Sequence, residues 1–239
     1  MPKTCSERAA PETTRVVLHG PTMGTRWSAT CELAPQIDAR ALQRDLAATV
    51  ERVDAQMSPW RSDSCLVQLN QAPVGAWFAL TTEMLQILAC ALDIGRLSQG
   101  AFDIGVGALV DAWGFGAARS APDASAIRAA RALAHGPAHE TLELDLHAGR
   151  ARKLAPLQID LCGIAKGYAV DRMAEVLQHH GVAQALAALD GELRAIGGQA
   201  DGRPWAVAIE SPQTGLRRAH GVLALQDLAV ATSGDYRHF

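Results

Sequence analysis

The segment that begins at Leu157 has the residue types of a phosphate-binding turn. It reads Leu157-Gln-Ile-Asp-Leu-Cys-Gly-Ile-Ala-Lys-Gly, an apolar run that passes through glycine into a helical pattern. We expect a strand to deliver Asp160 to a turn, Gly163 to open a helix, and Lys166 to lie in its first turn. A helix N-terminus attracts anions, and the lysine adds positive charge. The same residues also fit an ordinary strand–helix junction, so both interpretations stay open.

Two further side chains could contact a flat ligand. Trp60 follows a proline and precedes a polar run, so its indole could stack on a ring, or it could cap the core. Met23 lies in the turn segment 20–24, where its thioether could pack against an aromatic ring or fill space. The common phosphate-loop, dinucleotide, zinc-protease and serine-hydrolase motifs are absent from the sequence. No single motif therefore identifies the site.

Hydrophobic periodicity gives the elements that must position these residues. The expected strands are 14–19, 25–33, 142–146, the run from Leu157, 184–196, 204–210 and 222–232, and the expected helices are 38–57, 82–97, 124–134 and 164–180. The glycine-rich and aromatic-rich segment 101–119 predicts a shaped loop. Strands and helices alternate irregularly, which favours an α+β fold with mixed or antiparallel sheets and packed helices.

Composition limits the possible classes of protein. The 239 residues favour one domain, placed at 14–239 after a polar tail at 1–13, and 49% of them are hydrophobic. With 22 basic and 25 acidic residues, the net charge of −3 argues against a general nucleic-acid binder. No apolar run is long enough for a membrane span. As written, the chain has no secretory signal and is expected in the cytoplasm, or in the periplasm if translation starts further upstream.

The five cysteines predict reduced thiols. They are widely spaced, odd in number and without the spacing of a zinc site. His135 and His139 are four residues apart, but Gly136 and Pro137 lie between them and prevent a single helical face. The histidine pair is therefore expected on a surface loop and not as a metal site.

Six segments along the chain carry motifs in a fixed order. They are Pro21-Thr-Met-Gly-Thr25, Met57-Ser-Pro-Trp-Arg-Ser-Asp-Ser64 with Leu69-Asn70, Gly100-Ala-Phe-Asp-Ile-Gly-Val-Gly107 with Trp113-Gly-Phe-Gly116, Ile159-Asp-Leu-Cys-Gly-Ile-Ala-Lys-Gly-Tyr-Ala-Val-Asp171, residues 205–212, and Ala231-Thr-Ser-Gly-Asp-Tyr-Arg237. In this order they resemble the ApbE family, the FAD:protein FMN transferases. The resemblance covers about residues 15–237, and six ordered motifs argue against a chance match.

The resemblance implies a fold and a reaction. The implied fold is the ApbE-like (T-fold-like) α+β architecture. Family members split the pyrophosphate of FAD and transfer the FMN half to a threonine or serine hydroxyl of a target protein, and AMP leaves. Mg²⁺ assists by neutralising charge on the pyrophosphate. The implied partners are therefore FAD and an acceptor flavoprotein, such as a respiratory or redox subunit, that carries the target hydroxyl.

The resemblance also assigns contacts residue by residue. Gly163 matches a position that lends an oxygen to the metal, and as a glycine it offers only its backbone carbonyl. Asp190 stands where the family has a glycine in a tight turn, and aspartate tolerates left-handed geometry. No catalytic residue is assigned. The implied FAD contacts are Met23, Trp60, Ala101, Phe102, Asp103, Asp160 and Lys166.

Family sequences continue beyond the motif that ends at Arg237. Their continuation holds a histidine proposed as the base for the incoming hydroxyl, and the main magnesium ligands. The resemblance therefore implies a transferase truncated at its C-terminus, with an exposed sheet edge, poor stability and doubtful activity. The alternatives are a non-catalytic FAD-binding protein, an inactive gene fragment, or a transferase that completes its metal site from another chain.

Overall fold

The structure is a computed structural model that describes residues 12–116, 121–132, 136–213 and 218–234. Packing groups the chain into two compact units, unit 1 (residues 1–50 and 169–239) and unit 2 (residues 51–168). The division falls within helices α1 (Ala39–Met57) and α7 (Ala165–His179). The single domain expected over 14–239 stays a prediction. The expected tail at 1–13 lies outside the described residues except for its last two positions.

Unit 1 contains a five-stranded sheet in which neighbouring strands run antiparallel, in the order β1-β2-β6-β7-β10. A second, two-stranded sheet pairs β8 with β9. Both sheets belong to the expected α+β class with antiparallel sheets. The strands are β1 (Thr14–Thr22), β2 (Thr25–Leu33), β6 (Ala185–Leu189), β7 (Glu192–Ile196), β8 (Trp205–Glu210), β9 (Ala219–Leu225) and β10 (Ala229–Val230).

Two tight turns connect neighbouring strands of the larger sheet. Met23 and Gly24 have φ values of 44° and 70°, and Thr22 pairs with Thr25 on either side of them. Positive φ at both central residues is the geometry of a two-residue hairpin that matches strand twist. In the second turn, Asp190 has a φ of 55°, which confirms the left-handed geometry expected there.

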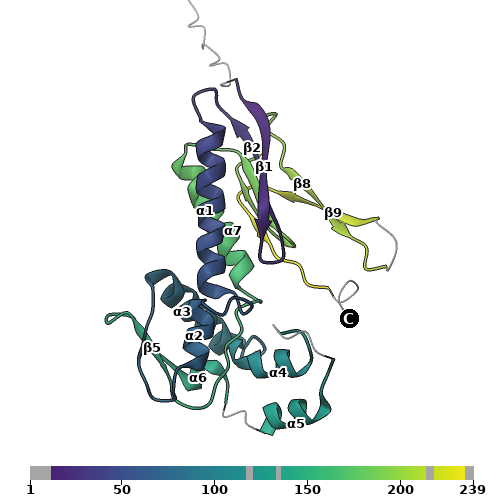
Figure 1. The fold of residues 1–239 in the computed structure, drawn as a ribbon. Coiled ribbons are helices and arrows are strands. Elements are labelled where there is room, and N and C mark those ends of the chain that lie inside the picture. Colours follow the sequence, from purple (N-terminus) through teal and green to yellow (C-terminus); the bar gives the residue numbers. More distant parts are fainter. Residues whose placement is uncertain (1–11, 117–120, 133–135, 214–217, 235–239) are drawn as a thin grey trace, which may run out of the picture. The chain divides into compact units, whose positions relative to one another are not determined.

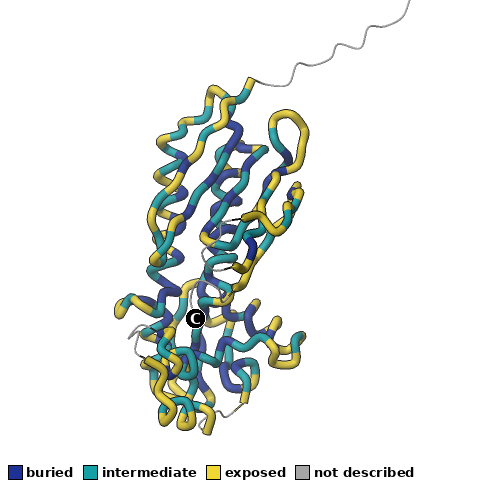
Figure 2. Tube along the Cα trace, turned by 90° about the vertical axis from the view of Figure 1, so that its right-hand side faces the viewer, coloured by how far each residue is buried: buried dark blue, intermediate teal, exposed yellow. Residues whose placement is uncertain are grey.

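Helices α1 and α7 lie beside this sheet (Figure 1). Side chains link the three elements: Gln43 of α1 donates to the carbonyl of His19, and Arg194 of β7 donates to Asp171 of α7. The apolar stripe predicted for 38–57 faces the core of unit 1, because its positions 42, 46 and 50 are buried. Figure 2 shows buried positions along these strands and helices, with exposed positions in the loops.

Unit 2 combines short helices with a small sheet in the antiparallel order β3-β5-β4. Within segment 101–119, where a loop was expected, the structure has η1 and α4, because the side chain of Asp103 accepts from a backbone N–H and caps η1. The elements are α2 (Cys65–Gln71), β3 (Phe78–Ala79), α3 (Thr82–Leu97), η1 (Ile104–Val106), α4 (Gly107–Ala112), α5 (Ala124–Ala132), α6 (Ala138–Thr141), β4 (Leu142–Asp145) and β5 (Arg150–Lys153).

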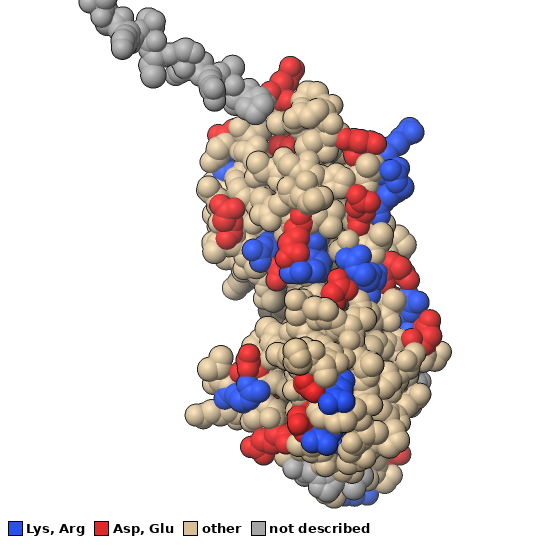
Figure 3. Space-filling model, turned by 90° about the vertical axis from the view of Figure 1, so that its left-hand side faces the viewer, with Lys and Arg blue, Asp and Glu red and all other residues tan. Residues whose placement is uncertain are grey.

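Charged side chains on the small sheet are paired across strands. Arg150 and Arg152 of β5 lie over the Trp77 ring at 4.4 and 4.5 Å from its centroid. The same arginines form ion pairs with Asp145 and Glu143 of β4. On the face drawn in Figure 3, positive and negative side chains are intermingled.

None of the helices in the described part of the chain is long and apolar enough to cross a membrane.

Candidate functional site

The segment that carries Phe102 and Asp103 is held by hydrogen bonds at both of its ends. The N–H of Phe102 donates to Oγ of Ser98, the residue that ends α3, at 3.0 Å. Oδ1 of Asp103 accepts from the N–H groups of Gly105 and Ala138, at 2.8 and 3.0 Å. Because Asp103 joins η1 to α6, the predicted contact segment Ala101–Asp103 has a fixed backbone.

Residues 157–161 form an extended segment and not the expected strand. The N–H of Asp160 donates to the carbonyl of Ile104 at 2.8 Å, and the N–H of Gly107 donates to the carbonyl of Gln158 at 3.0 Å. On the other side, the amide of Asn70 bonds to the backbone of Ile159. A side chain and the backbone of η1 and α4 thus provide the hydrogen bonds that neighbouring strands would form, and the apolar pattern alone does not distinguish the two cases.

Asp160 lies in the turn that leads to α7, as predicted. Its Oδ1 accepts from the N–H of Cys162 at 2.7 Å. Burial raises the pKa of Cys162 to about 12, and the neighbouring Asp160 carboxylate adds to this rise, whereas the positive charge of Lys166 opposes it. Lys166 is the second residue of α7 and lies in its first turn, as predicted. The turn therefore presents a carboxylate and an ammonium group close to one protonated thiol.

Phe102 and the turn before α7 meet at Gly163. A Cβ atom added to Gly163 would lie 3.4 Å from Cε2 of Phe102, an ordinary contact distance. The structure therefore brings together four predicted site residues from two segments that are about 60 positions apart in the sequence: Phe102, Asp103, Asp160 and Gly163.

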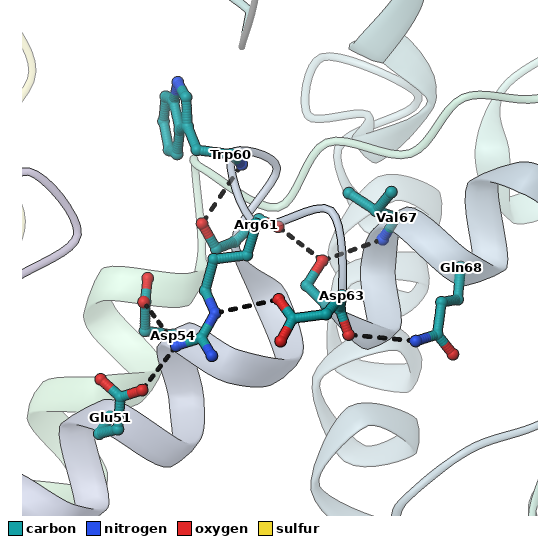
Figure 4. A network of polar contacts seen from close by, with 9 residues as sticks. Glu51, Asp54, Trp60, Arg61, Asp63, Val67 and Gln68 are labelled. Carbon is teal, nitrogen blue, oxygen red and sulfur yellow. Dashed lines mark hydrogen bonds and ion pairs between the residues drawn. The ribbon is translucent and has the colours of Figure 1, made fainter.

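Trp60 lies on another loop of unit 2, whose backbone is fixed by two serines. Oγ of Ser64 donates to the carbonyl of Ser58 at 2.7 Å and accepts from the N–H of Val67, and so caps α2. The N–H of Trp60 donates to Oγ of Ser58 at 3.3 Å. The residue is 46% exposed, and Figure 4 shows its indole pointing away from the polar network. The exposed position favours the stacking interpretation over a core cap.

Arg61 ties the Trp60 loop to helix α1 (Figure 4). Its guanidinium contacts Glu51 at 2.5 Å, Asp54 at 3.4 Å and Asp63 at 3.4 Å. The hydrogen bond from Arg61 lowers the pKa of Asp63, and the carboxylates raise the pKa of Arg61. Glu51 and Asp63 are solvent-exposed and Arg61 is partly exposed, so these pairs orient the loop more than they stabilise the fold.

Met23 and Ala101 complete the predicted set. Met23 occupies the left-handed turn between β1 and β2 and belongs to unit 1, so its role as a flavin contact stays a prediction. Ala101 is exposed next to Phe102, and its N–H donates to the carbonyl of Ser98 at 3.1 Å. The assignment of all seven residues to FAD comes from the resemblance and stays a prediction.

The expected magnesium site finds little support in the side chains around Gly163. Mg²⁺ requires near-octahedral oxygen ligands at short distances. Within the described ranges, no group of three or more His, Cys, Asp or Glu residues could hold a metal ion. Asp160 is the nearby carboxylate, and its Oδ1 is already bonded to the N–H of Cys162. The described residues thus do not fit a complete site, and the Gly163 carbonyl as a ligand stays a prediction.

No role was predicted for Asn70, although its motif is part of the family resemblance. The residue bonds to a backbone 89 positions further along the chain, a separation that no local pattern reveals. Lys153 was also overlooked, and its buried ammonium donates to the Asn70 carbonyl. The only local sign of a specific contact was the polar residue Asn70 near the end of a helix whose leucines are buried.

Alkylation by iodoacetamide at pH 8 is expected to modify Cys90 at least about tenfold faster than Cys31 or Cys162 in the folded protein. Burial raises the pKa of both Cys31 and Cys162 to about 12, so little reactive thiolate is present, whereas Cys90 is exposed. Peptide mapping by mass spectrometry measures each site, and the difference should disappear in concentrated urea. Equal labelling of Cys162 and Cys90 in the folded state would contradict the burial of this turn.

Known proteins share both the sequence and the fold of this chain. The model of the ApbE family matches residues 23–239. The chain is 38% identical to an "FAD:protein FMN transferase" of Vibrio cholerae over 94% of this chain, and 33% identical to one of Klebsiella pneumoniae over 97%. In each case it covers 67% of the relative, so the chain spans about two thirds of the length of these curated relatives.

Two solved structures share the fold of this chain. The "Flavin Transferase ApbE from Vibrio cholerae" superposes with a TM-score of 0.84 at 36% identity, over 95% of this chain and 74% of that one. The apo form of the "Pseudomonas stutzeri flavinyl transferase ApbE" gives 0.82 at 32% identity, over 95% and 73%. The α+β fold with antiparallel sheets is therefore the fold of these proteins.

Proposed function

This chain belongs to the ApbE family, and from that premise we propose that it is an FAD:protein FMN transferase. The reaction moves FMN from FAD to a threonine or serine hydroxyl of an acceptor flavoprotein. The hydroxyl oxygen forms a bond to the phosphorus of the FMN half. The pyrophosphate P–O bond breaks, AMP leaves with the bridging oxygen, and the hydroxyl proton passes to solvent or to a base.

One observation carries the proposal most strongly. Phe102, Asp103, Asp160 and Gly163 match FAD-contact or metal positions of the family, and they lie together in unit 2 although two distant segments supply them. Hydrogen bonds from the N–H groups of Phe102 and Asp160, and to the carboxylate of Asp103, hold these segments in place. A site with prearranged geometry loses less entropy on binding, as expected for nucleotide recognition.

The chemistry of each side chain suggests its task. The exposed indole of Trp60 can stack on a flat ring of FAD. Lys166, in the first turn of α7, adds positive charge where the helix dipole already favours the pyrophosphate. Asp160 keeps acceptor capacity on its carboxylate, which suits hydroxyl or N–H groups of the nucleotide and not its phosphates. Cys162 stays protonated at neutral pH and is therefore no nucleophile.

Magnesium and the acceptor are finer parts of the proposal. In the family reaction a divalent ion neutralises charge on the pyrophosphate. The described side chains near Gly163 offer too few free oxygen ligands to assign that ion a place, so we route no step through it. The proposed acceptor is a respiratory or redox flavoprotein with an accessible threonine or serine.

Equilibrium dialysis with FAD, with and without Mg²⁺, tests recognition, and chromatography of AMP tests bond cleavage. We expect FAD binding, AMP release in the presence of Mg²⁺, and a fluorescent flavin band on an acceptor domain in a denaturing gel. FAD binding without AMP release would instead support a non-catalytic FAD-binding protein. Absence of FAD binding by the folded chain would overturn the proposal.

A further inference from the structure

The side chain of Asn70 forms the two backbone hydrogen bonds that a neighbouring β-strand would form with the segment before Asp160. Its Nδ2–H donates to the carbonyl of Ile159 at 2.9 Å, and the N–H of Ile159 donates to its Oδ1 at 2.8 Å. A carboxamide offers a donor and an acceptor side by side, so one side chain satisfies both polar groups of one residue. Ile159 is 2% exposed, so water cannot easily replace these bonds.

Asn70 is itself held in place. It lies in the last turn of α2, where Leu66 and Leu69 are fully buried. The ammonium of Lys153, which is 5% exposed, donates to the Asn70 carbonyl at 2.5 Å. Because these contacts hold Asn70 in place, its amide can fix the position of the Ile159 backbone relative to α2.

The segment bonded by Asn70 leads directly to Asp160. On its opposite side, the N–H of Asp160 donates to the carbonyl of Ile104, the first residue of η1, which directly follows Phe102 and Asp103. Asn70 on one side and residues 104–107, which form η1 and the start of α4, on the other therefore hold the segment. Without Asn70, the buried N–H and carbonyl of Ile159 lose their partners, and the segment must move to find new ones.

We infer that Asn70 is a positioning residue for FAD recognition: its amide fixes the Ile159 peptide groups and thereby sets the place of the Asp160 carboxylate. This inference rests on the proposed function, because the proposed function assigns Asp160 to FAD binding. Asn70 acts through Asp160 and does not itself touch the nucleotide. The expectation follows the general behaviour of sites whose contact residues are oriented by a supporting layer of hydrogen bonds.

Asn70→Asp and Asn70→Ala test the inference in the full chain. Asn70→Asp keeps the size and one acceptor for the Ile159 N–H but places an oxygen against the Ile159 carbonyl. We expect the Kd for FAD, measured by equilibrium dialysis at a temperature where every variant is folded, to rise at least about tenfold. Amide hydrogen exchange of residues 157–161 should also become faster, because local opening is easier.

Thr81→Ala is the matched control. Oγ1 of Thr81 accepts from the N–H of Met84 and caps α3 in the same unit, so its loss lowers stability without touching residues 157–161. We expect an unchanged FAD Kd and unchanged exchange at 157–161 in this variant. A weaker FAD affinity in Thr81→Ala equal to that in Asn70→Asp would reduce the Asn70 effect to general destabilisation and overturn the inference.

The outcomes separate the inference from the proposed function. If the wild type binds FAD and the folded Asn70→Asp variant binds it equally well, the positioning role is wrong and the proposed function stands. If the folded wild type does not bind FAD, the proposed function falls, and the role of Asn70 in FAD recognition falls with it. If Asn70→Ala fails to fold, Asn70→Asp still decides.

Discussion

Replacing Asp103 by alanine is expected to abolish measurable FAD binding and to lower the free energy of unfolding by about 3 kcal/mol. One carboxylate oxygen accepts from two backbone N–H groups, those of Gly105 and Ala138. Both donors lose a charged acceptor in the variant, and the link between η1 and α6 is broken. Urea-induced unfolding measures the change in stability, and equilibrium dialysis measures FAD binding.

Two variants define the cause of this effect. Asp103→Asn keeps an acceptor oxygen of the same shape, so the expected loss is smaller, about 1 kcal/mol. Asp123→Ala removes a comparable cap, since Asp123 accepts from the N–H groups of Ser125 and Ala126 at the start of α5. Its expected loss is about 1 kcal/mol with no change in FAD affinity. Wild-type stability and FAD binding in Asp103→Ala would show that the double contact has no role.

Replacing Gly107 by valine is expected to lower the free energy of unfolding by about 3 kcal/mol and to weaken FAD binding strongly. A Cβ atom at this position would lie 2.7 Å from the carbonyl oxygen of Gln158 and 2.9 Å from its Cγ. The glycine N–H donates to that same carbonyl at 3.0 Å. The added side chain therefore separates the start of α4 from the segment that leads to Asp160. Thermal unfolding and FAD dialysis measure the two effects.

Gly167→Ala is the control with the opposite sign. Gly167 lies in the first turn of α7, and among the described residues nothing apart from its chain neighbours and its own helix backbone lies within 4 Å of the place where its Cβ would be. Alanine favours a helix over glycine by up to about 1 kcal/mol, so this variant is expected to be slightly more stable than the wild type. Equal effects of Gly107→Val and Gly167→Ala on stability would contradict the close approach at Gln158.

Local sequence patterns predicted the four longest helices that the structure describes, α1, α3, α5 and α7, and several turns. The apolar spacing within 38–57 and 82–97 matches α1 and α3 to within one residue at each end, because one buried stripe repeats at helical period over several turns. The left-handed φ of Asp190 was expected from the family resemblance, because aspartate tolerates the geometry of the glycine that it replaces. The conformation of a residue in such a helix depends mainly on neighbours three or four positions away.

The same patterns were wrong where partners are distant. The apolar run at 157–161 was expected to be a strand, but its backbone bonds to a side chain at position 70 and to residues of η1 and α4. Segment 101–119 was expected to be a loop, but Asp103 caps a short helix there. Hydrophobicity shows that such a segment is buried, but it does not show which groups satisfy its backbone.

The sequence by itself determined the family, the α+β class and the candidate contacts, because motif residues and periodic patterns are local properties of the chain. Only the tertiary structure decided that Phe102, Asp103, Asp160 and Gly163 lie together, and that Asn70 holds the segment before Asp160. The physical reason is that a buried polar group must find a partner somewhere in the fold. Packing decides where that partner is, and sequence separation sets no limit on it.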